Sequence, residues 1–150
     1  MNSIAQASTA TPEPRAQHSS TDEQGVAVTY QAAGVYVARE IYAEALKQTN
    51  PAKTLDDICD ALPEVMPQVV KAMGTAPSVA AALLPGVTDR LEAFTAVERA
   101  RVDAGDGYGY LFDYLADGLS KGADPKAVRA QALAAPGRIR ELAAQAEGAA

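Results

Sequence analysis

The side chains that most often carry enzyme chemistry are sparse in this sequence. Its single histidine is His18, and its single cysteine is Cys59. A Ser-His-Asp or Cys-His apparatus needs an imidazole as its base, and no histidine follows residue 18. Zinc and di-iron sites in helical proteins need several imidazole or thiolate ligands. The composition therefore predicts no catalytic triad, no metal centre and no cofactor.

A glycine-rich stretch, residues 103–110, has the most unusual local composition, with carboxylates at Asp103 and Asp106. A calcium loop of the EF-hand kind needs oxygen ligands at positions 1, 3 and 5, glycine at 6 and glutamate at 12, and no register here supplies them. We interpret the stretch as a turn between two helices. A cation near the two carboxylates is left open as the alternative.

Four carboxylates, Asp56, Asp57, Asp60 and Glu64, surround Cys59. Paired carboxylates can serve as general acid and base when their surroundings separate their pKa values. Negative charge is also favoured in the first turns of a helix without any catalytic role. We interpret the cluster as a solvated helix face and Cys59 as a small core residue, with a reactive thiol as the alternative.

The tyrosines offer a different chemistry, that of protein contacts. A partly exposed tyrosine buries ring area against a partner while its hydroxyl finds a hydrogen bond. Helical spacing does not place all six tyrosines on core faces. The sequence therefore leaves two interpretations of Tyr30, Tyr36, Tyr42, Tyr110 and Tyr114 open: an interaction surface, or positions at the edge of the core.

The elements that hold these side chains are predicted to be helices separated by proline and glycine. Residues 108–119 show the clearest helical period, because Leu111, Phe112, Leu115 and Leu119 share one face. Gly122 should end that helix, and the next should begin after Asp124. Prolines at 63, 67, 85 and 136 should end or break other helices. The predicted fold is an all-α, compact bundle of six to eight short helices.

The helix expected to begin near Thr88 is predicted to be amphipathic. Its inner side carries Val87, Leu91, Phe94 and Val97, with Val102 as a further candidate. Its charged side chains are expected on the outside, as is usual for a surface helix; they are Arg90, Glu92, Glu98, Arg99 and Arg101.

Two segments are predicted along the chain of 150 residues. Residues 1–24 are rich in Ser, Thr, Gln, Ala and Pro and have no hydrophobic period, which predicts a flexible, disordered polar arm. Residues 25–150 are expected to form a single helical domain. Residues 25–37 are predicted to be helical, although their valines and tyrosines also fit a short hairpin.

The net charge is −6, and it is spread along the chain. Nucleic-acid affinity depends largely on clustered Lys and Arg, so this balance disfavours a nucleic-acid partner. The one mild basic group is Lys126, Arg129, Arg138 and Arg140. No stretch reaches the roughly 18 to 20 apolar residues of a membrane span. With no secretory signal at its start, the chain is expected in the cytoplasm or within a macromolecular particle.

Three functions compete on these observations. The first is a non-catalytic, acidic assembly or adaptor subunit that acts through protein contacts, as a homo-oligomer or with another protein, for example in a phage particle or secretion complex. The chain has few large apolar side chains, with two Phe and no Trp, so its core is small. Association with another subunit is one way to bury more apolar area. The second is a small enzyme or small-molecule binder that uses Asp and Tyr in an inter-helix cleft. The third is a helical nucleic-acid regulator that uses Arg129, Arg138 and Arg140.

Overall fold

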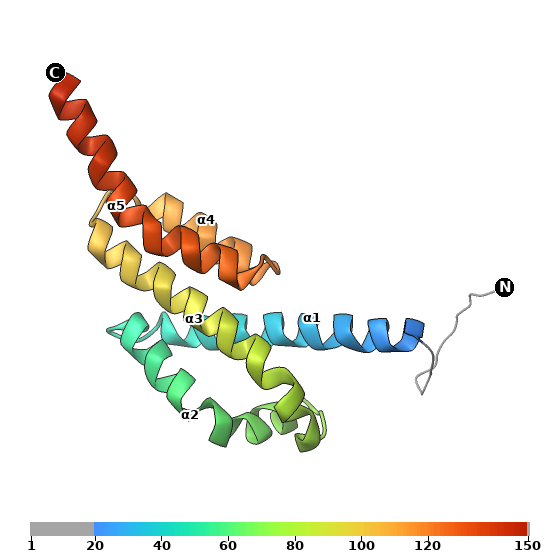
Figure 1. Cartoon of the computed structure of the whole chain (residues 1–150). Coiled ribbons are helices and arrows are strands. Elements are labelled where there is room, and N and C mark those ends of the chain that lie inside the picture. The colour runs from blue at the N-terminus through green and yellow to red at the C-terminus, as the bar shows by residue number, and fades with distance from the viewer. Residues whose placement is uncertain (1–19, 150) are drawn as a thin grey trace. The chain divides into compact units, whose positions relative to one another are not determined.

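The computed structural model describes residues 20–149 of the chain, with side chains described for residues 30–148. Within these residues the fold is all-helical and contains no strand. The elements are α1 (Ser20–Ala45), α2 (Pro51–Ala72), the short 3-10 helix η1 (Pro77–Val79), α3 (Ala80–Ala104), α4 (Gly109–Ser120) and α5 (Pro125–Ala149) (Figure 1). Residues 25–37 lie within α1 and are helical, as preferred over a hairpin.

The chain divides into two compact units, Met1–Gln31 and Ala32–Ala150. In the first unit the described part is the beginning of α1. The second unit contains the rest of α1 and every other element. Residues 1–19 of the predicted arm lie outside the described residues, and α1 begins at Ser20, inside the predicted arm. The flexible arm itself stays a prediction.

The predicted count of six to eight helices is too high, because four prolines lie inside helices rather than between them. Pro63 and Pro67 lie within α2, Pro85 within α3 and Pro136 within α5. A proline inside a helix removes one backbone hydrogen bond and costs about 3 kcal/mol. Apolar residues on both sides of a proline can offset this cost when they pack against the same neighbour. Leu62 and Met66, on either side of Pro63, are both buried.

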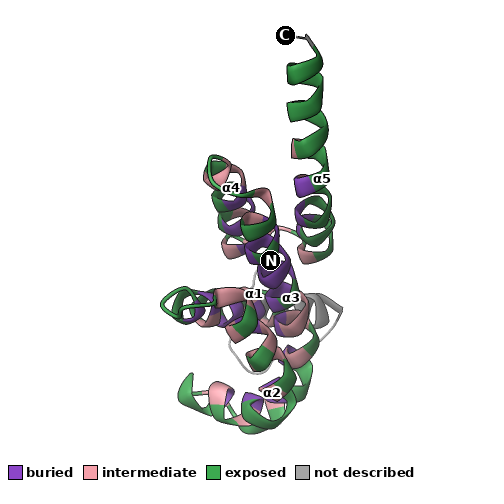
Figure 2. Ribbon diagram, turned by 90° about the vertical axis from the view of Figure 1, so that its left-hand side faces the viewer, coloured by how far each residue is buried: buried purple, intermediate pink, exposed green. Residues whose placement is uncertain are grey.

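The core lies around α3, against which α2, α4, α5 and η1 pack. Buried residues run along most of α3 and along the facing sides of its neighbours (Figure 2). Phe94 on α3 and Phe112 on α4 are the largest fully buried side chains. The expected inner faces are confirmed for Val87, Leu91, Val97, Leu115 and Leu119, which are buried as well. Val102, also expected on the inner side, is instead 80% exposed, because it lies in the last turn of α3.

Short turns join α3, α4 and α5. Gly105 has φ 79° and Gly122 has φ 101°, a backbone region that favours glycine, so both helix ends are confirmed. The side chain of Asp124 accepts a hydrogen bond from the backbone N–H of Lys126 at 3.2 Å, and Pro125 is the first residue of α5. These caps place α5 after α4 with no long connection.

Helices α3 and α5 run in the same direction. Glu92, in the middle of α3, lines a groove together with Arg129, early in α5. Asp103, at the end of α3, lies 3.6 Å from Arg140. Because α3 ends at Ala104, the last turns of α5 continue beyond it (Figure 1).

None of the helices in the described part of the chain combines the length and the apolar character needed to cross a bilayer. This agrees with the expectation drawn from the sequence.

Candidate functional site

The five tyrosines predicted to form an interaction surface have different surroundings. Tyr110 and Tyr114 are 76% and 75% exposed, and Tyr36 is 46% exposed. Tyr30 is partly buried. Tyr42 is 7% exposed and lies in the core. The structure therefore keeps three of these rings accessible, and it removes Tyr42 from the predicted surface.

Tyr110 and Tyr114 form the most exposed aromatic feature of the described chain, and we call them the tyrosine pair. They lie four residues apart on α4, so their side chains project from the same face, one turn apart. The opposite face of α4 carries Phe112, Leu115 and Leu119, which are buried. Burial of that face fixes which side of α4 meets solvent. The tyrosine pair is thus displayed on an anchored helix rather than on a loop.

Tyr36 lies on α1, which contacts the end of α4. The guanidinium of Arg39 lies 5.5 Å from the centre of the Tyr36 ring, within the range of a cation–π contact. The same guanidinium donates to the backbone carbonyl of Ser120, at the end of α4, at 3.4 Å. Arg39 therefore connects the Tyr36 ring to α4, the helix of the tyrosine pair.

Tyr42 is buried because α1 crosses α3 at this point. Its ring stacks on Phe94 with centroids 4.0 Å apart and an interplanar angle of 13°. Its hydroxyl donates to Oε2 of Glu98 at 2.7 Å. Burial, and then the hydrogen bond and charge of Glu98, raise the pKa of the Tyr42 phenol well above its ordinary value. The phenol stays protonated at neutral pH, which fits a structural hydrogen bond.

Arg101 joins this buried pair to α4. Its guanidinium lies 3.3 Å from Oε2 of Glu98 and 2.8 Å from Oδ1 of Asp113, and it donates to the carbonyl of Gly109 at 3.4 Å. Burial lowers the pKa of Arg101, but the hydrogen bond to Asp113 and the charge of Glu98 outweigh burial and raise it. Arg101 stays charged and holds the first turn of α4, next to Tyr110, against α3.

The expectation that the charged residues of α3 lie on its outside is wrong for two of them. Glu98 and Arg90 are each only 6% exposed. Arg90 lies where Gly34 of α1 meets Gly86 of α3, and its Nη1 donates to the carbonyl of Gly86 at 3.0 Å. A Cβ at Gly86 would come within 3.1 Å of that nitrogen. The two glycines thus leave room for a buried guanidinium, whose Nε has no partner among the described residues.

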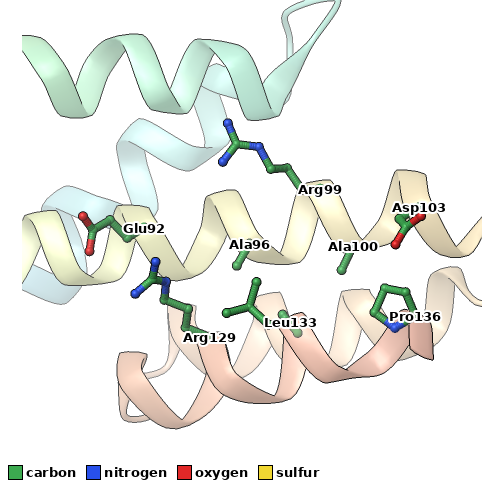
Figure 3. Close-up of a pocket in the computed structure, with 9 residues that line it drawn as sticks. Glu92, Ala96, Arg99, Ala100, Asp103, Arg129, Leu133 and Pro136 are labelled. Atoms are coloured by element: carbon green, nitrogen blue, oxygen red, sulfur yellow. The ribbon is translucent and has the colours of Figure 1, made fainter. Parts of the chain in front are cut away.

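A groove of about 230 Å³ lies between α3 and α5 (Figure 3). Ala96 and Ala100 on α3 leave the space, and Leu133 of α5 points toward it. Glu92 and Arg129 lie at one end of the groove, and Asp103 lies at the other (Figure 3). The small-molecule alternative requires an inter-helix cleft lined by Asp and Tyr. This groove lies between two helices, and its lining contains carboxylates but no tyrosine.

Of the two arginines that line the groove, Arg99 forms its ion pair outside it. Arg99 points away from the groove (Figure 3) and forms an ion pair with Asp56 of α2. Both side chains are substantially exposed, so the ion pair contributes little to stability. Of the groove's charged residues, Arg129 and Glu92 are therefore the two best placed to meet a ligand.

The acidic cluster around Cys59 fits the interpretation of a solvated face. Asp57 forms an exposed pair with Lys53 at 3.0 Å, and Asp60 and Glu64 are exposed. Cys59 is partly buried, and burial, followed by the charges of Glu92 and Asp60, raises its thiol pKa to about 11. A thiol with that pKa is protonated at neutral pH and is a poor nucleophile.

The carboxylates of the glycine-rich turn do not meet in a cation site. Asp103 lies 3.6 Å from Arg140, and both Asp103 and Asp106 are exposed. Across the described part of the chain, no three His, Cys, Asp or Glu side chains are grouped so that they could hold a metal ion. The structure assigns the stretch to the turn between α3 and α4, as the sequence indicated.

The basic group of α5 is interleaved with carboxylates. Arg138 lies 3.6 Å from Glu141, and Arg140 lies 3.6 Å from Asp103. Arg129 lines the groove opposite Glu92. An electrostatic surface for a phosphate backbone needs clustered and uncompensated cations. The structure gives the nucleic-acid alternative no such cluster on α5.

Sequence reasoning missed the Tyr42–Glu98–Arg101–Asp113 network, in which Tyr42 and Glu98 are buried and Asp113 is exposed. Glu98 and Arg101 have the spacing of an exposed ion pair on a helix, and Tyr42 was among the tyrosines considered for the interaction surface. The crossing of α1 over α3 brings Tyr42 to this pair, and the packing of α4 on α3 brings Asp113, so no local signal could have found the network. Comparison of the chain with protein-family models, with curated proteins and with solved structures gave no match.

Proposed function

We propose that this chain is a non-catalytic assembly or adaptor subunit that acts through protein–protein contacts. The observation that supports this most is the tyrosine pair, two rings one helical turn apart that are 76% and 75% exposed. Tyrosine is enriched in interfaces and among the residues that contribute most binding energy. Two such rings on one helix face would supply the anchors of a helix-mediated contact.

The packing of α4 beneath the tyrosine pair favours recognition of a partner by a preformed surface. The helix is anchored by Phe112 and Leu119 on its buried face, and Arg101 holds its first turn. A surface that is already ordered loses less conformational entropy when a partner binds. The partner therefore meets rings whose backbone is held in place.

The state of the polar groups also supports a non-catalytic function. The Tyr42 phenol and the Cys59 thiol both have raised pKa values, so both are protonated at neutral pH. Asp56, Asp57 and Asp113 form ion pairs with basic side chains. General base and nucleophilic catalysis need groups whose pKa values are matched to proton transfer near neutral pH. A macromolecular complex, such as a phage particle or a secretion apparatus, remains the proposed setting.

The direct test is capture of binding partners with matched variants. The full chain, the Tyr110→Ser/Tyr114→Ser double variant and a Leu133→Ser control would each be used as bait in the cells that express the chain. Leu133 is 65% exposed on α5, so the control removes an exposed apolar side chain from another helix. Loss of two anchor residues should lower recovery of a partner about tenfold or more.

The test compares which captured partners are lost with each variant. A partner lost with the double variant and retained with Leu133→Ser supports the proposal. Circular dichroism must show that the double variant keeps the helical content of the parent chain. If every partner is retained by the double variant, the tyrosine pair is not the contact surface and the proposal loses its main support.

The groove between α3 and α5 favours one second candidate, a small-molecule binder. Its volume of about 230 Å³ is below the roughly 300–1,000 Å³ usual for ligand pockets, which limits it to a small ligand. Arg129 and Glu92 would orient that ligand. In a thermal-shift screen of small metabolites, a stabilising ligand should lose its effect in Ala100→Leu, which fills the groove, and keep it in Tyr110→Ser.

A further inference from the structure

The last turns of α5 carry an apolar face that nothing in the described structure covers. Val128, Ala132 and Pro136 are buried where α5 packs along α3. Residues 141–148, here called the α5 extension, are all exposed. The extension stands apart from the other helices of its unit (Figure 2). Its exposure follows from the end of α3 at Ala104, beside Arg140.

The buried face of α5 continues into the extension without a change of register. Ile139, Ala143 and Ala146 follow Val128, Ala132 and Pro136 at helical spacing, and Leu142 lies at the edge of the same face. Ile139 is partly buried, whereas Leu142 is 50% exposed. The α5 face that packs on α3 therefore continues beyond the end of α3. An alanine-rich helical segment of this length gains little stability in water unless its apolar face is packed.

We propose that a second copy of this chain covers the extension, with the two α5 helices side by side and antiparallel. The choice of occupant rests on charge. Arg140 and Glu147 lie seven residues apart, so they share one flank of the apolar face. Antiparallel helices related by a two-fold axis bring like flanks together, which places Arg140 opposite Glu147 of the second copy, twice in each dimer.

The same charges disfavour the parallel arrangement. Parallel helices bring opposite flanks together. The flank opposite Arg140 and Glu147 carries Ala135 and Leu142, neither of which is charged. A parallel pair would therefore leave Arg140 and Glu147 without an opposite charge across the contact. Charge thus selects one orientation, which an apolar face alone could not do.

Rearrangement of the existing ion pairs would cost little. Arg140 lies 3.6 Å from Asp103, and their side chains are 65% and 61% exposed. Exposed pairs of this kind contribute little, so Arg140 is free to turn toward a second copy. Ala143 and Ala146 would allow the helices to approach closely, and Leu142 would supply the largest apolar contact. A contact this short belongs to the small, weak class of interfaces, so the dimer should form at micromolar or higher concentration.

This inference deepens the proposed function, because it rests on the chain acting through protein contacts and assigns one of them to a second copy. It uses α5, whereas the partner contact of the proposed function uses α4. The two can therefore fail separately. A chain that loses captured partners through Tyr110→Ser/Tyr114→Ser while it stays monomeric at all concentrations would keep the proposed function and lose this inference.

Sedimentation equilibrium of the full chain tests the charge pairing. The parent chain should dimerise, and Arg140→Glu or Glu147→Arg alone should weaken dimerisation about tenfold, because each places like charges opposite each other. The double variant Arg140→Glu/Glu147→Arg restores the pairs with their signs exchanged. Its dissociation constant should return to within about threefold of the parent value.

Two controls keep the result specific. Lys126→Glu reverses an exposed charge at the start of α5, outside the extension, and should leave dimerisation unchanged. Asp103→Asn removes the intramolecular partner of Arg140 and should not weaken the dimer. The inference is overturned if the parent chain stays monomeric up to about 1 mM, if the single variants dimerise as the parent does, or if the double variant stays as weak as the singles.

Discussion

Residues 90–100 of α3 and residues 141–148 of α5 are both alanine-rich helix with charged side chains among the alanines. In the α3 stretch all residues except Glu92 and Arg99 are buried, whereas every residue of the α5 extension is exposed. The difference lies in the neighbours, because α2, α4 and α5 pack around α3 and α1 crosses it at Tyr42. Intrinsic helix propensity makes both stretches helical but does not decide which becomes core.

The largest contrast between the two stretches should come from apolar truncation. Phe94→Ala should lower the free energy of unfolding by about 3–5 kcal/mol, because it removes a buried ring and leaves a cavity. Leu142→Ala should change it by less than about 0.5 kcal/mol in dilute solution, since that side chain is half exposed. Urea denaturation followed by circular dichroism measures both. An equal cost for the two variants would contradict the assignment of the core to α3.

Breaking the polar network of the α3 stretch should have the next largest effect. Glu98→Ala leaves the Tyr42 hydroxyl and the Arg101 guanidinium without their shared carboxylate and should cost about 3 kcal/mol. The control Glu44→Ala removes an exposed pair with Lys47 and should cost less than about 1 kcal/mol. The costs of Tyr42→Phe and Glu98→Ala should not add, because the residues share one hydrogen bond. Strict additivity in denaturation experiments would argue against that bond.

Alkaline pH should affect the packed region and not the extension. The pKa of Cys59 rises from 9.0 to about 11 on folding, so the folded state holds its thiol proton more tightly than the unfolded state does. The resulting stability is present below pH 9 and is lost as the pH rises toward 11. In Cys59→Ala the fall in unfolding free energy over this range should be smaller than in the parent chain. Urea midpoints from pH 8 to 11 that change equally in both proteins would contradict this account.

The smallest expected effect is a glycine substitution in the extension. Ala143→Gly should lower helicity in the last turns of α5 without shifting the midpoint of unfolding, since this segment can unfold locally. Ala93→Gly, at a buried position of α3, should shift the midpoint and lower stability by about 1 kcal/mol or more. Circular dichroism and urea denaturation separate the two results. A shift of the midpoint by Ala143→Gly would show that the extension unfolds together with the core.

Much of the fold could be predicted from residue patterns. The period of Phe112, Leu115 and Leu119 identified the buried face of α4, and Gly122 and Asp124 identified the turn into α5. These features depend on residues close in sequence, whose backbone preferences act locally. The number of helices was overestimated because the effect of a proline inside a helix depends on what packs on either side of it.

The candidate sites could likewise be predicted only in part from the sequence. Tyr36, Tyr110 and Tyr114 are exposed enough to act as the sequence predicted, whereas Tyr42 is buried. A tyrosine on an amphipathic helix can face the core or solvent, and the outcome depends on which helix lies opposite. The burial of Glu98 and Arg90 followed from the crossing of α1 over α3, which no local pattern encodes.

Alanine-rich helices with glycine-containing turns could be predicted from residue types and spacing, and so could the near absence of histidine and cysteine chemistry. Helix formation depends on contacts within a few residues, so composition and spacing suffice for it. The packing of the helices buries Glu98 against Tyr42, exposes Tyr110 and Tyr114 on α4, and leaves the last turns of α5 beyond the end of α3. Those outcomes depend on contacts between residues far apart in the chain, and burial is set by all the surrounding helices together.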